Sequence, residues 1–255
     1  MRLKLIACKA LFREISYVAA LSDNMIDITW MRQGYHVDPG LLHTMLEKEI
    51  DAIEEGTDPH SYSIRENYVG DEPEDFDAIL LGYGLCSNAI AGIRARNHRL
   101  VIPRAHDCIT LFLGSKERYA SCFKEIPGCY WYTASWIENG GLPGKERRER
   151  ARRRYEEMGY DEETVEYLLD ATDGLKNYHN LAYVKMPFGD SERYIAQTKA
   201  AADDLGWKYH EMDGDLRLLE RFLAGEWNEE DFLILEPGET AVQSVDGRII
   251  KKAEA

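Results

Sequence analysis

The sequence predicts an α/β protein, Rossmann-like, in which helices flank a mainly parallel sheet. Short continuous apolar runs, such as AILL at 78–81 and LVIP at 100–103, are bounded by turn residues. Such runs are typical of parallel strands that are covered on both faces. They alternate with segments of helical periodicity, which implies right-handed β-α-β crossovers.

In the first half of the chain, the expected strands and helices are separated by turn residues and by changes in the period at which apolar residues recur. We expect strands at 2–7, 25–30, 78–81, 100–103 and 129–133, and helices ending near 21, beginning at 39 and spanning 115–122. Asp38 is suited to cap the helix that begins at Pro39. The segment 57–75 is polar and interrupted by Pro and Gly, so it is expected to be a loop.

The character of the chain changes at Ile137, and the breaker cluster GGLPG follows at 140–144. Beyond it we expect helices at 145–157, 161–169, 191–205 and 216–224, and strands at 181–186, 207–211 and 232–235. This pattern predicts an α/β domain over 1–136 and a helical insertion plus a second α/β portion over 137–255. The halves form either two lobes around a cleft or one sheet with a helical insertion near 138–178.

The composition limits the class of partner. The net charge of -15 argues against binding to nucleic-acid backbones and to anionic membranes. No apolar run approaches the roughly 18 residues that span a bilayer. The basic start is interrupted by Arg13 and Glu14, which does not fit a secretion signal. We therefore expect a cytoplasmic protein with a small-molecule substrate and neither nucleic-acid nor membrane partners.

Three cysteines and one histidine lie between the end of an expected strand and the helix that follows it: Cys8, His36, Cys86 and Cys108. Because the carboxyl ends of parallel strands share one edge of a sheet, where ligands bind, we expect these side chains to converge. Thiolate and imidazole favour zinc, and thiolates also hold iron–sulfur clusters. The sequence thus predicts a zinc site, with a cluster as the alternative. The competing interpretation is that they are small residues packed at crowded turns.

The same two turns carry further candidates. His106 is suited to be a ligand or general base, Asp107 to orient His106 or cap a helix, and Arg104 to bind a carboxylate or phosphate. At the other turn, Tyr83 and Gly84 precede Cys86, and Ser87 and Asn88 are expected to open a helix.

The amide groups of that expected helix would bind an anion or lower the pKa of the Cys86 thiol. The rival hypothesis is therefore a metal-free cysteine hydrolase or transferase that pairs Cys86 with His106 or His36. It leaves Cys8 and Cys108 unexplained. Cys122 and Cys129 are interpreted as packing residues, and an odd number of cysteines argues against a disulfide framework.

The sequence contains the motifs YGLC at 83–86, PR at 103–104, HDCI at 106–109, LGS at 113–115, Cys8 with Arg13-Glu14, and His36 before Pro39. Together they resemble an uncharacterised family of conserved proteins from anaerobic bacteria and methanogenic archaea, catalogued as a domain of unknown function. The resemblance covers most of the chain and is strongest in 1–136. Ser87 and Val37 stand where the family usually has Gly and Asn.

Members of that family often occur beside corrinoid-dependent methyltransferase systems, so the resemblance implies a role in one-carbon metabolism. The resulting hypothesis is a zinc enzyme that handles a methyl group on a small thiol, amine or corrinoid-linked carrier, with a corrinoid protein or methyltransferase as partner. His106 would move the proton and Arg104 would anchor an anionic group. The alternative is an accessory protein that delivers a metal, cluster or corrinoid. The chain lacks the pattern of a cobalamin-binding domain, so we do not expect it to carry the corrinoid.

Overall fold

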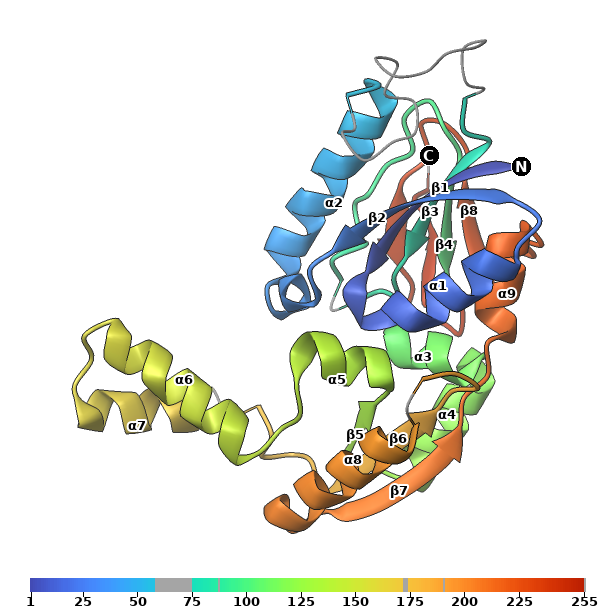
Figure 1. Cartoon of the computed structure of the whole chain (residues 1–255). Helices are drawn as coiled ribbons and strands as arrows, with labels where there is room; N and C mark the ends of the chain where they lie inside the picture. Colours follow the sequence, from blue (N-terminus) through green and yellow to red (C-terminus); the bar gives the residue numbers. More distant parts are fainter. Residues whose placement is uncertain (58–74, 87, 172–173, 190, 255) are drawn as a thin grey trace, which may run out of the picture. The chain divides into compact units, whose positions relative to one another are not determined.

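The computed structural model has the expected α/β fold (Figure 1). It describes residues 1–57, 75–86, 88–171, 174–189 and 191–254, so Ser87 and nearly all of the expected loop at 57–75 lie outside the described residues. The chain forms two compact units. Unit 1 comprises Met1–Tyr119 and Asp215–Ala255, and unit 2 comprises Ala120–Gly214.

The sheet of unit 1 has five strands in the order β2-β1-β3-β4-β8. They are β1 (Arg2–Cys8), β2 (Met25–Met31), β3 (Ala78–Gly82), β4 (Leu100–Pro103) and β8 (Phe232–Leu235). The first four are parallel, and β8 pairs antiparallel with β4. The chain leaves β1 for β2 on one side and later returns to β3 on the other side. The strand order therefore reverses between β1 and β3, where doubly wound sheets bind their ligands.

The helices of unit 1 include those expected to end near 21 and to begin at 39, together with two short 3-10 helices that were not predicted. They are η1 (Lys9–Leu11), α1 (Phe12–Leu21), η2 (Gln33–Val37), α2 (Pro39–Glu54), α3 (Cys108–Leu113) and α9 (Arg217–Ala224). A further helix, α4 (Lys116–Glu125), begins in unit 1 and continues into unit 2. The Asp38 carboxylate accepts the amide of Leu41 at 3.0 Å, which confirms the predicted cap of α2. Figure 1 shows α1 and α9 together against the sheet and α2 apart from them.

The centre of this sheet is fully buried. Every residue of β3 and β4 is buried, as expected for strands covered on both faces. β1 also contains Lys4, whose ammonium group lies 3.0 Å from the carboxylate of Asp27 on β2. Both side chains are almost completely buried, so their charges compensate each other inside the protein.

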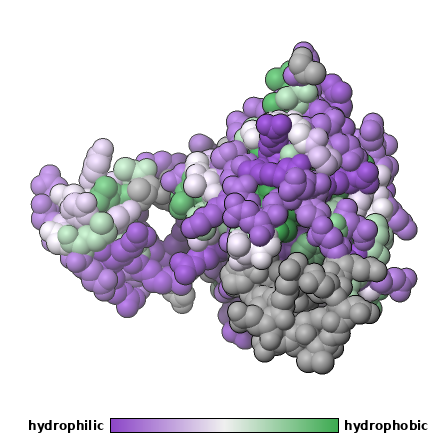
Figure 2. Space-filling view, turned by 90° about the horizontal axis from the view of Figure 1, so that it is seen from above, coloured by the Kyte–Doolittle hydropathy of each residue, from purple (hydrophilic) through white to green (hydrophobic). Residues whose placement is uncertain are grey.

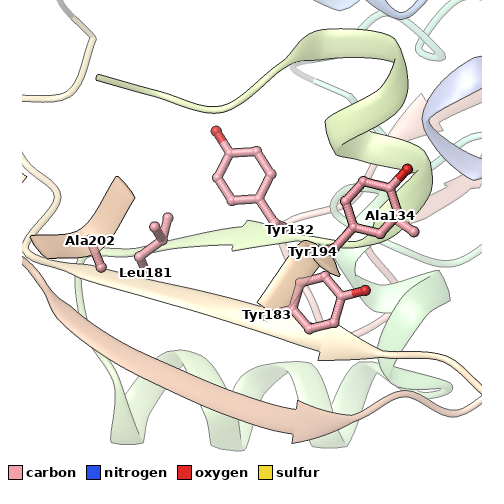
Figure 3. Close-up of a cluster of buried hydrophobic side chains, with 6 residues drawn as sticks. All are labelled: Tyr132, Ala134, Leu181, Tyr183, Tyr194 and Ala202. Carbon is pink, nitrogen blue, oxygen red and sulfur yellow. The ribbon is translucent and has the colours of Figure 1, made fainter. Parts of the chain in front are cut away.

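Unit 2 has a separate parallel sheet in the order β5-β6-β7. Its elements are β5 (Cys129–Tyr132), α5 (Ala134–Gly140), α6 (Lys145–Glu157), α7 (Glu162–Ala171), β6 (Asn180–Lys185), α8 (Ser191–Leu205) and β7 (Lys208–Asp213). Figure 3 shows part of its core, which is rich in tyrosine: Tyr132, Ala134, Leu181, Tyr183, Tyr194 and Ala202.

The division of the chain differs from the predicted boundary at 136–137. Unit 2 already begins at Ala120, and the chain from Asp215 onward returns to unit 1. The cause is β8, which adds to the free edge of β4 with Leu100 opposite Leu235. Two short strands, β9 (Ala241–Gln243) and β10 (Ile250–Lys252), were not predicted.

The helix expected to open at Ser87 and Asn88 is wrong for the described residues. From Asn88 to Gly92 the chain forms turns. The φ angle of Asn88 is 71°, and that of Gly92 is 94°. A left-handed conformation cannot continue an α-helix. The amide of Gly92 instead donates to the carbonyl of Ala241 at 2.8 Å, which ties this segment to the C-terminal strands.

The face seen in Figure 2 is largely hydrophilic, as expected from a charged fraction of 30%. Within the described residues, none of the helices combines the length and the apolar character needed to cross a membrane.

Candidate functional site

Three cysteines meet at the carboxyl ends of β1, β3 and β4. Cys8 ends β1, Cys86 lies in the turn after β3, and Cys108 is the first residue of α3. Their charges are coupled, because Cys8 raises the pKa of Cys86, and both Cys86 and Cys8 raise that of Cys108. Such coupling requires short distances. We call Cys8, Cys86 and Cys108 the thiol cluster, and its formation follows from the strand order β1-β3-β4.

Backbone contacts between two turns hold the cluster in place. The amide of Leu85 donates to the carbonyl of Ala105 at 2.7 Å, and the amide of Cys86 donates to the carbonyl of His106 at 3.0 Å. Gly84 permits this approach, because a Cβ atom there would lie 2.7 Å from the amide nitrogen of Asp107. Cys86 itself has a φ of 46°, an uncommon conformation for a residue with a side chain.

Burial makes the thiols of the cluster weak acids. Burial is the largest cause of the raised pKa at each of the three residues. The pKa of Cys8 is raised to about 11 and that of Cys86 to about 12. The pKa of Cys108 is also raised well above its usual value, by burial first and then by Asp107 and the other two thiols. At neutral pH the thiols are therefore protonated, and a bound cation would favour their ionisation.

Tyr83 adds a buried hydroxyl to the cluster. The residue is 2% exposed, and its hydroxyl has no hydrogen-bond partner among the described residues. Its pKa is raised by burial and then by the charges of Cys8, Cys86 and Cys108, so the phenol lies close to all three thiols. A buried hydroxyl without a partner costs about 1–3 kcal/mol. Such a group in a folded protein calls for a ligand or water that would satisfy it.

Asp107 caps α3 and thereby fixes Cys108. One carboxylate oxygen accepts the amide of Ile109 at 3.0 Å, and the other accepts the hydroxyl of Tyr119 at 3.1 Å. Burial raises the pKa of Asp107, and these hydrogen bonds oppose that rise. Of the two predicted roles, the structure therefore shows capping. Nothing in the sequence pattern indicated Tyr119.

The two predicted histidines lie at the surface near this region. His106 is exposed, and its ring centroid lies 6.1 Å from that of Tyr119. His36 is also exposed, and its Nδ1 contacts the backbone carbonyl of Gln33. The residue of η2 that acts on the electrostatics of Tyr83 is Tyr35, not His36.

The predicted metal ligands do not form a finished metal site. As the side chains stand, no group of three or more His, Cys, Asp or Glu residues in the described part of the chain is arranged to hold a metal ion. The roles of His36 as a ligand and of Asn88 in cofactor binding stay predictions. Asn88 lies in the turn after Cys86, where its carbonyl accepts the amide of Ala91 at 3.1 Å.

Arg104 joins the end of β4 to the C-terminal segment. Its Nε donates to the carbonyls of Glu229 at 2.8 Å and Phe232 at 3.2 Å. Its Nη1 donates to the carbonyls of Arg248, at 3.3 Å, and Ile250. These contacts hold the guanidinium toward the C-terminal strands, and the predicted role of Arg104 as the anchor of an anionic group stays a prediction.

A family described as "Protein of unknown function (DUF1638)" matches residues 30–223 of the chain, which is well over half of its length. The match includes Cys86, Cys108 and Tyr83 and begins after Cys8. No curated protein and no solved structure matches the chain.

Proposed function

This chain belongs to the DUF1638 family of proteins of unknown function, and we propose that it is a zinc enzyme acting on a small molecule. In this proposal Cys8, Cys86 and Cys108 bind the metal, and the reaction moves a methyl group to or from a small thiol, amine or corrinoid-linked carrier. The observation that carries the metal part is the thiol cluster with the unsatisfied hydroxyl of Tyr83 beside it.

The position of the cluster in the fold supports ligand binding. β1 and β3 are the two strands between which the strand order reverses; Cys8 is the last residue of β1, and Cys86 lies in the turn that follows β3. The diverging connections at such a point leave a crevice in open α/β sheets. No other part of the described sheet of unit 1 combines this position with cysteine.

The acid–base state of the cluster supports a metal over a free nucleophile. A cysteine nucleophile needs a lowered pKa, whereas burial first, and then Cys8 and Asp107, raise the pKa of Cys86 to about 12. A divalent cation replaces the thiol protons and removes the repulsion between the sulfur atoms. Binding would require the three cysteine side chains to adopt rotamers that direct their sulfur atoms to one point.

Three cysteine ligands would leave one position of a tetrahedral zinc ion open for substrate. The metal would supply Lewis acidity that favours the deprotonated form of a bound thiol or amine. Tyr83 would donate a hydrogen bond to the group in that position. His106, which is exposed and lies two residues before Cys108, would carry the released proton to solvent. The methyl-transfer part rests on the family resemblance of the sequence and on the preference of such reactions for an activated thiolate.

The second candidate is an accessory protein that holds or delivers an iron–sulfur cluster. Three cysteines without a fourth protein thiolate nearby favour this alternative, because a cluster accepts an external ligand at its remaining iron. The two candidates use the same residues and differ in the metal they retain.

The test is metal analysis of protein purified without oxygen, together with its ultraviolet–visible spectrum. We expect about one zinc per chain, and loss of that zinc in Cys8→Ser, Cys86→Ser and Cys108→Ser. Cys129→Ser is the matched control, because Cys129 is a buried cysteine of unit 2 that lies outside the thiol cluster. Replacement of zinc by cobalt should add sulfur-to-cobalt absorption bands in wild type and in Cys129→Ser alone.

A brown protein that contains iron and sulfide would instead support the accessory role. Full zinc retention in any one of the three cluster variants would contradict the proposed ligand set. The metal-free cysteine enzyme would be favoured if the protein takes up no metal with its thiols reduced and loses activity on alkylation of Cys86.

A further inference from the structure

A second pocket of unit 1 lies on the C-terminal side of β4, with a volume of about 470 Å³. Basic side chains dominate its lining: Arg104, Arg248, Lys251 and Lys252. Two carboxylates, of Glu229 and Glu254, and apolar residues of β8 complete the wall. A basic pocket is unexpected in a protein with a net charge of -15.

The central feature of this pocket is the charge of Arg104. The residue is 8% exposed, and all of its hydrogen bonds go to backbone carbonyls through Nε and Nη1. Among the described residues, no carboxylate lies within ion-pair distance of this guanidinium, and its Nη2 makes no hydrogen bond. Because Nη2 is also not among the fully enclosed polar atoms, it is the end of the side chain that reaches the pocket.

A buried arginine without an anionic partner is unusual, because buried charges are normally paired. Here the nearest charges do not compensate it fully. Burial and then the like charge of Arg248 lower the pKa of Arg104, while Glu229 and Asp246 oppose this effect. An anion at the position that Nη2 faces would therefore offset the cost of holding this charge inside the protein.

The other basic groups of the pocket are held only by surface ion pairs. Lys251 lies 3.1 Å from Glu254, and Lys252 lies 2.7 Å from Glu239. Both lysines are at least one-third exposed, so these pairs contribute little to stability. A bound anion can therefore replace these carboxylates as the partner of the two ammonium groups with little loss of free energy.

We propose that this pocket binds a small organic anion through a phosphate or carboxylate group that contacts Nη2 of Arg104. Lys251 and Lys252 add attraction at the rim. The volume exceeds that of a bare ion and falls in the range of small-molecule sites, and the half-buried Ile234 offers apolar surface for the body of the ligand. The inference is independent of the thiol cluster and of any metal.

The test is calorimetric titration of the full chain, in a buffer without phosphate or carboxylate, with inorganic phosphate and with succinate as separate probes. Stronger binding of one probe identifies the anionic group. Arg104→Gln should weaken that binding at least about tenfold, because a hydrogen bond to a charged group is lost. The double variant Lys251→Gln with Lys252→Gln leaves Arg104 in place and should weaken binding about threefold.

Lys48→Gln is the matched control, since it removes one exposed positive charge from α2, away from the pocket lining. If Arg104→Gln does not fold, the binding affinity of the double lysine variant tests the proposal. Binding in the double variant that equals that of Lys48→Gln would overturn the proposal. So would the absence of binding of both probes to wild type at about 10 mM, an affinity below that of specific sites.

Discussion

The main sheets of the two units each contain a lysine–aspartate pair between register partners of neighbouring parallel strands, and the two pairs have the same 3.0 Å separation. Lys4 faces Asp27 in unit 1, and Lys185 faces Asp213 in unit 2. The first pair is buried, with 0% and 3% of the side chains exposed, whereas the second is 43% and 79% exposed. The geometry of an ion pair therefore does not indicate its energetic role, which depends on its surroundings.

The cysteines repeat this contrast. Cys129 of unit 2 has its pKa raised to about 12, as has Cys86 of unit 1, and burial is the largest cause in both. Cys129 lies at the amino end of β5, where its thiol contacts the carbonyl of Tyr130 at 3.6 Å. Cys122 adds to the rise in the pKa of Cys129. Cys86 lies beyond the carboxyl end of β3 and is coupled to both Cys8 and Cys108. Burial and a neighbouring thiol are thus common to both cysteines, and the candidate site is distinguished by its third thiol and by its place at the carboxyl ends of the strands.

The largest expected difference between the units concerns the ion pairs. Asp27→Ala should lower the free energy of unfolding by about 3–5 kcal/mol, because it removes the carboxylate that pairs with the buried ammonium group of Lys4. Asp213→Ala removes the exposed partner of Lys185 and should have little effect. Urea unfolding of both variants checks the comparison, and equal losses would show that burial does not control these pairs.

The second difference concerns two glycines. Gly84→Ala should destabilise the protein by about 1–3 kcal/mol, because the new Cβ would collide with backbone atoms. Those atoms, of Asp107 and Ala105, lie 2.7–2.9 Å from the Cβ position. Gly174→Ala in unit 2 is the control, since nothing lies within 4 Å of its Cβ position. Thermal unfolding should show a lower Tm for the first variant only, and an unchanged Tm would mean that the two turns are not tightly fixed.

The third difference concerns two tyrosines. The hydroxyls of Tyr83 and Tyr132 are both buried without a hydrogen-bond partner among the described residues. Replacement of either by Phe should leave the metal-free protein as stable as wild type or up to about 1 kcal/mol more stable. Only Tyr83→Phe should weaken zinc binding, by about tenfold, in a competition titration with a chelator. Equal zinc affinities for the two variants would remove Tyr83 from the site.

The smallest difference concerns two histidines whose pKa values move in opposite directions. Burial lowers the pKa of His98, but the hydrogen bonds to Glu54 and Asp75 outweigh it, so the pKa is raised. Burial and then Lys208 lower the pKa of His210. A proton titration followed by NMR should place His98 above and His210 below the usual value of about 6.5.

Stability should follow the same signs. The contribution of His98 is complete below about pH 6.5 and is lost as the pH rises through its folded-state pKa. His98→Gln should therefore cost more stability at about pH 5.5 than at about pH 8.5. His210 disfavours folding as the pH falls below about 6.5, so His210→Gln should show the reverse trend. A pH-independent loss in both variants would contradict the assigned causes.

Local chemistry explains why much of the fold could be predicted. Asp38 before Pro39 and Ser115 before α4 cap their helices as expected, because capping depends on residues within one turn. The meeting of Cys8, Cys86 and Cys108 was also predictable once the strands were expected to be parallel. The methyl-transfer role, the metal and its identity stay predictions.

Other features depend on contacts between distant segments, which the local pattern does not contain. The helix expected after Cys86 is replaced by turns that bond to the chain near Ala241. The local sequence predicts that Arg104 anchors an anionic group, but it does not indicate the hydrogen-bond partners of this side chain. Those partners lie beyond residue 228 in the sequence. The unsatisfied hydroxyl of Tyr83 depends on what surrounds it in three dimensions, and no spacing of residues indicates it.

The position of β8 also affects how the chain is made. β1, β2, β3 and β4 leave the ribosome first, but the strand that covers the outer edge of β4 follows only after all of unit 2. At roughly 5–20 residues per second, the apolar edge LVIP waits for several seconds or longer without its partner. Exposed apolar edges promote association between chains. Nascent copies of this protein are therefore most prone to aggregate, and most in need of chaperones, during synthesis of unit 2.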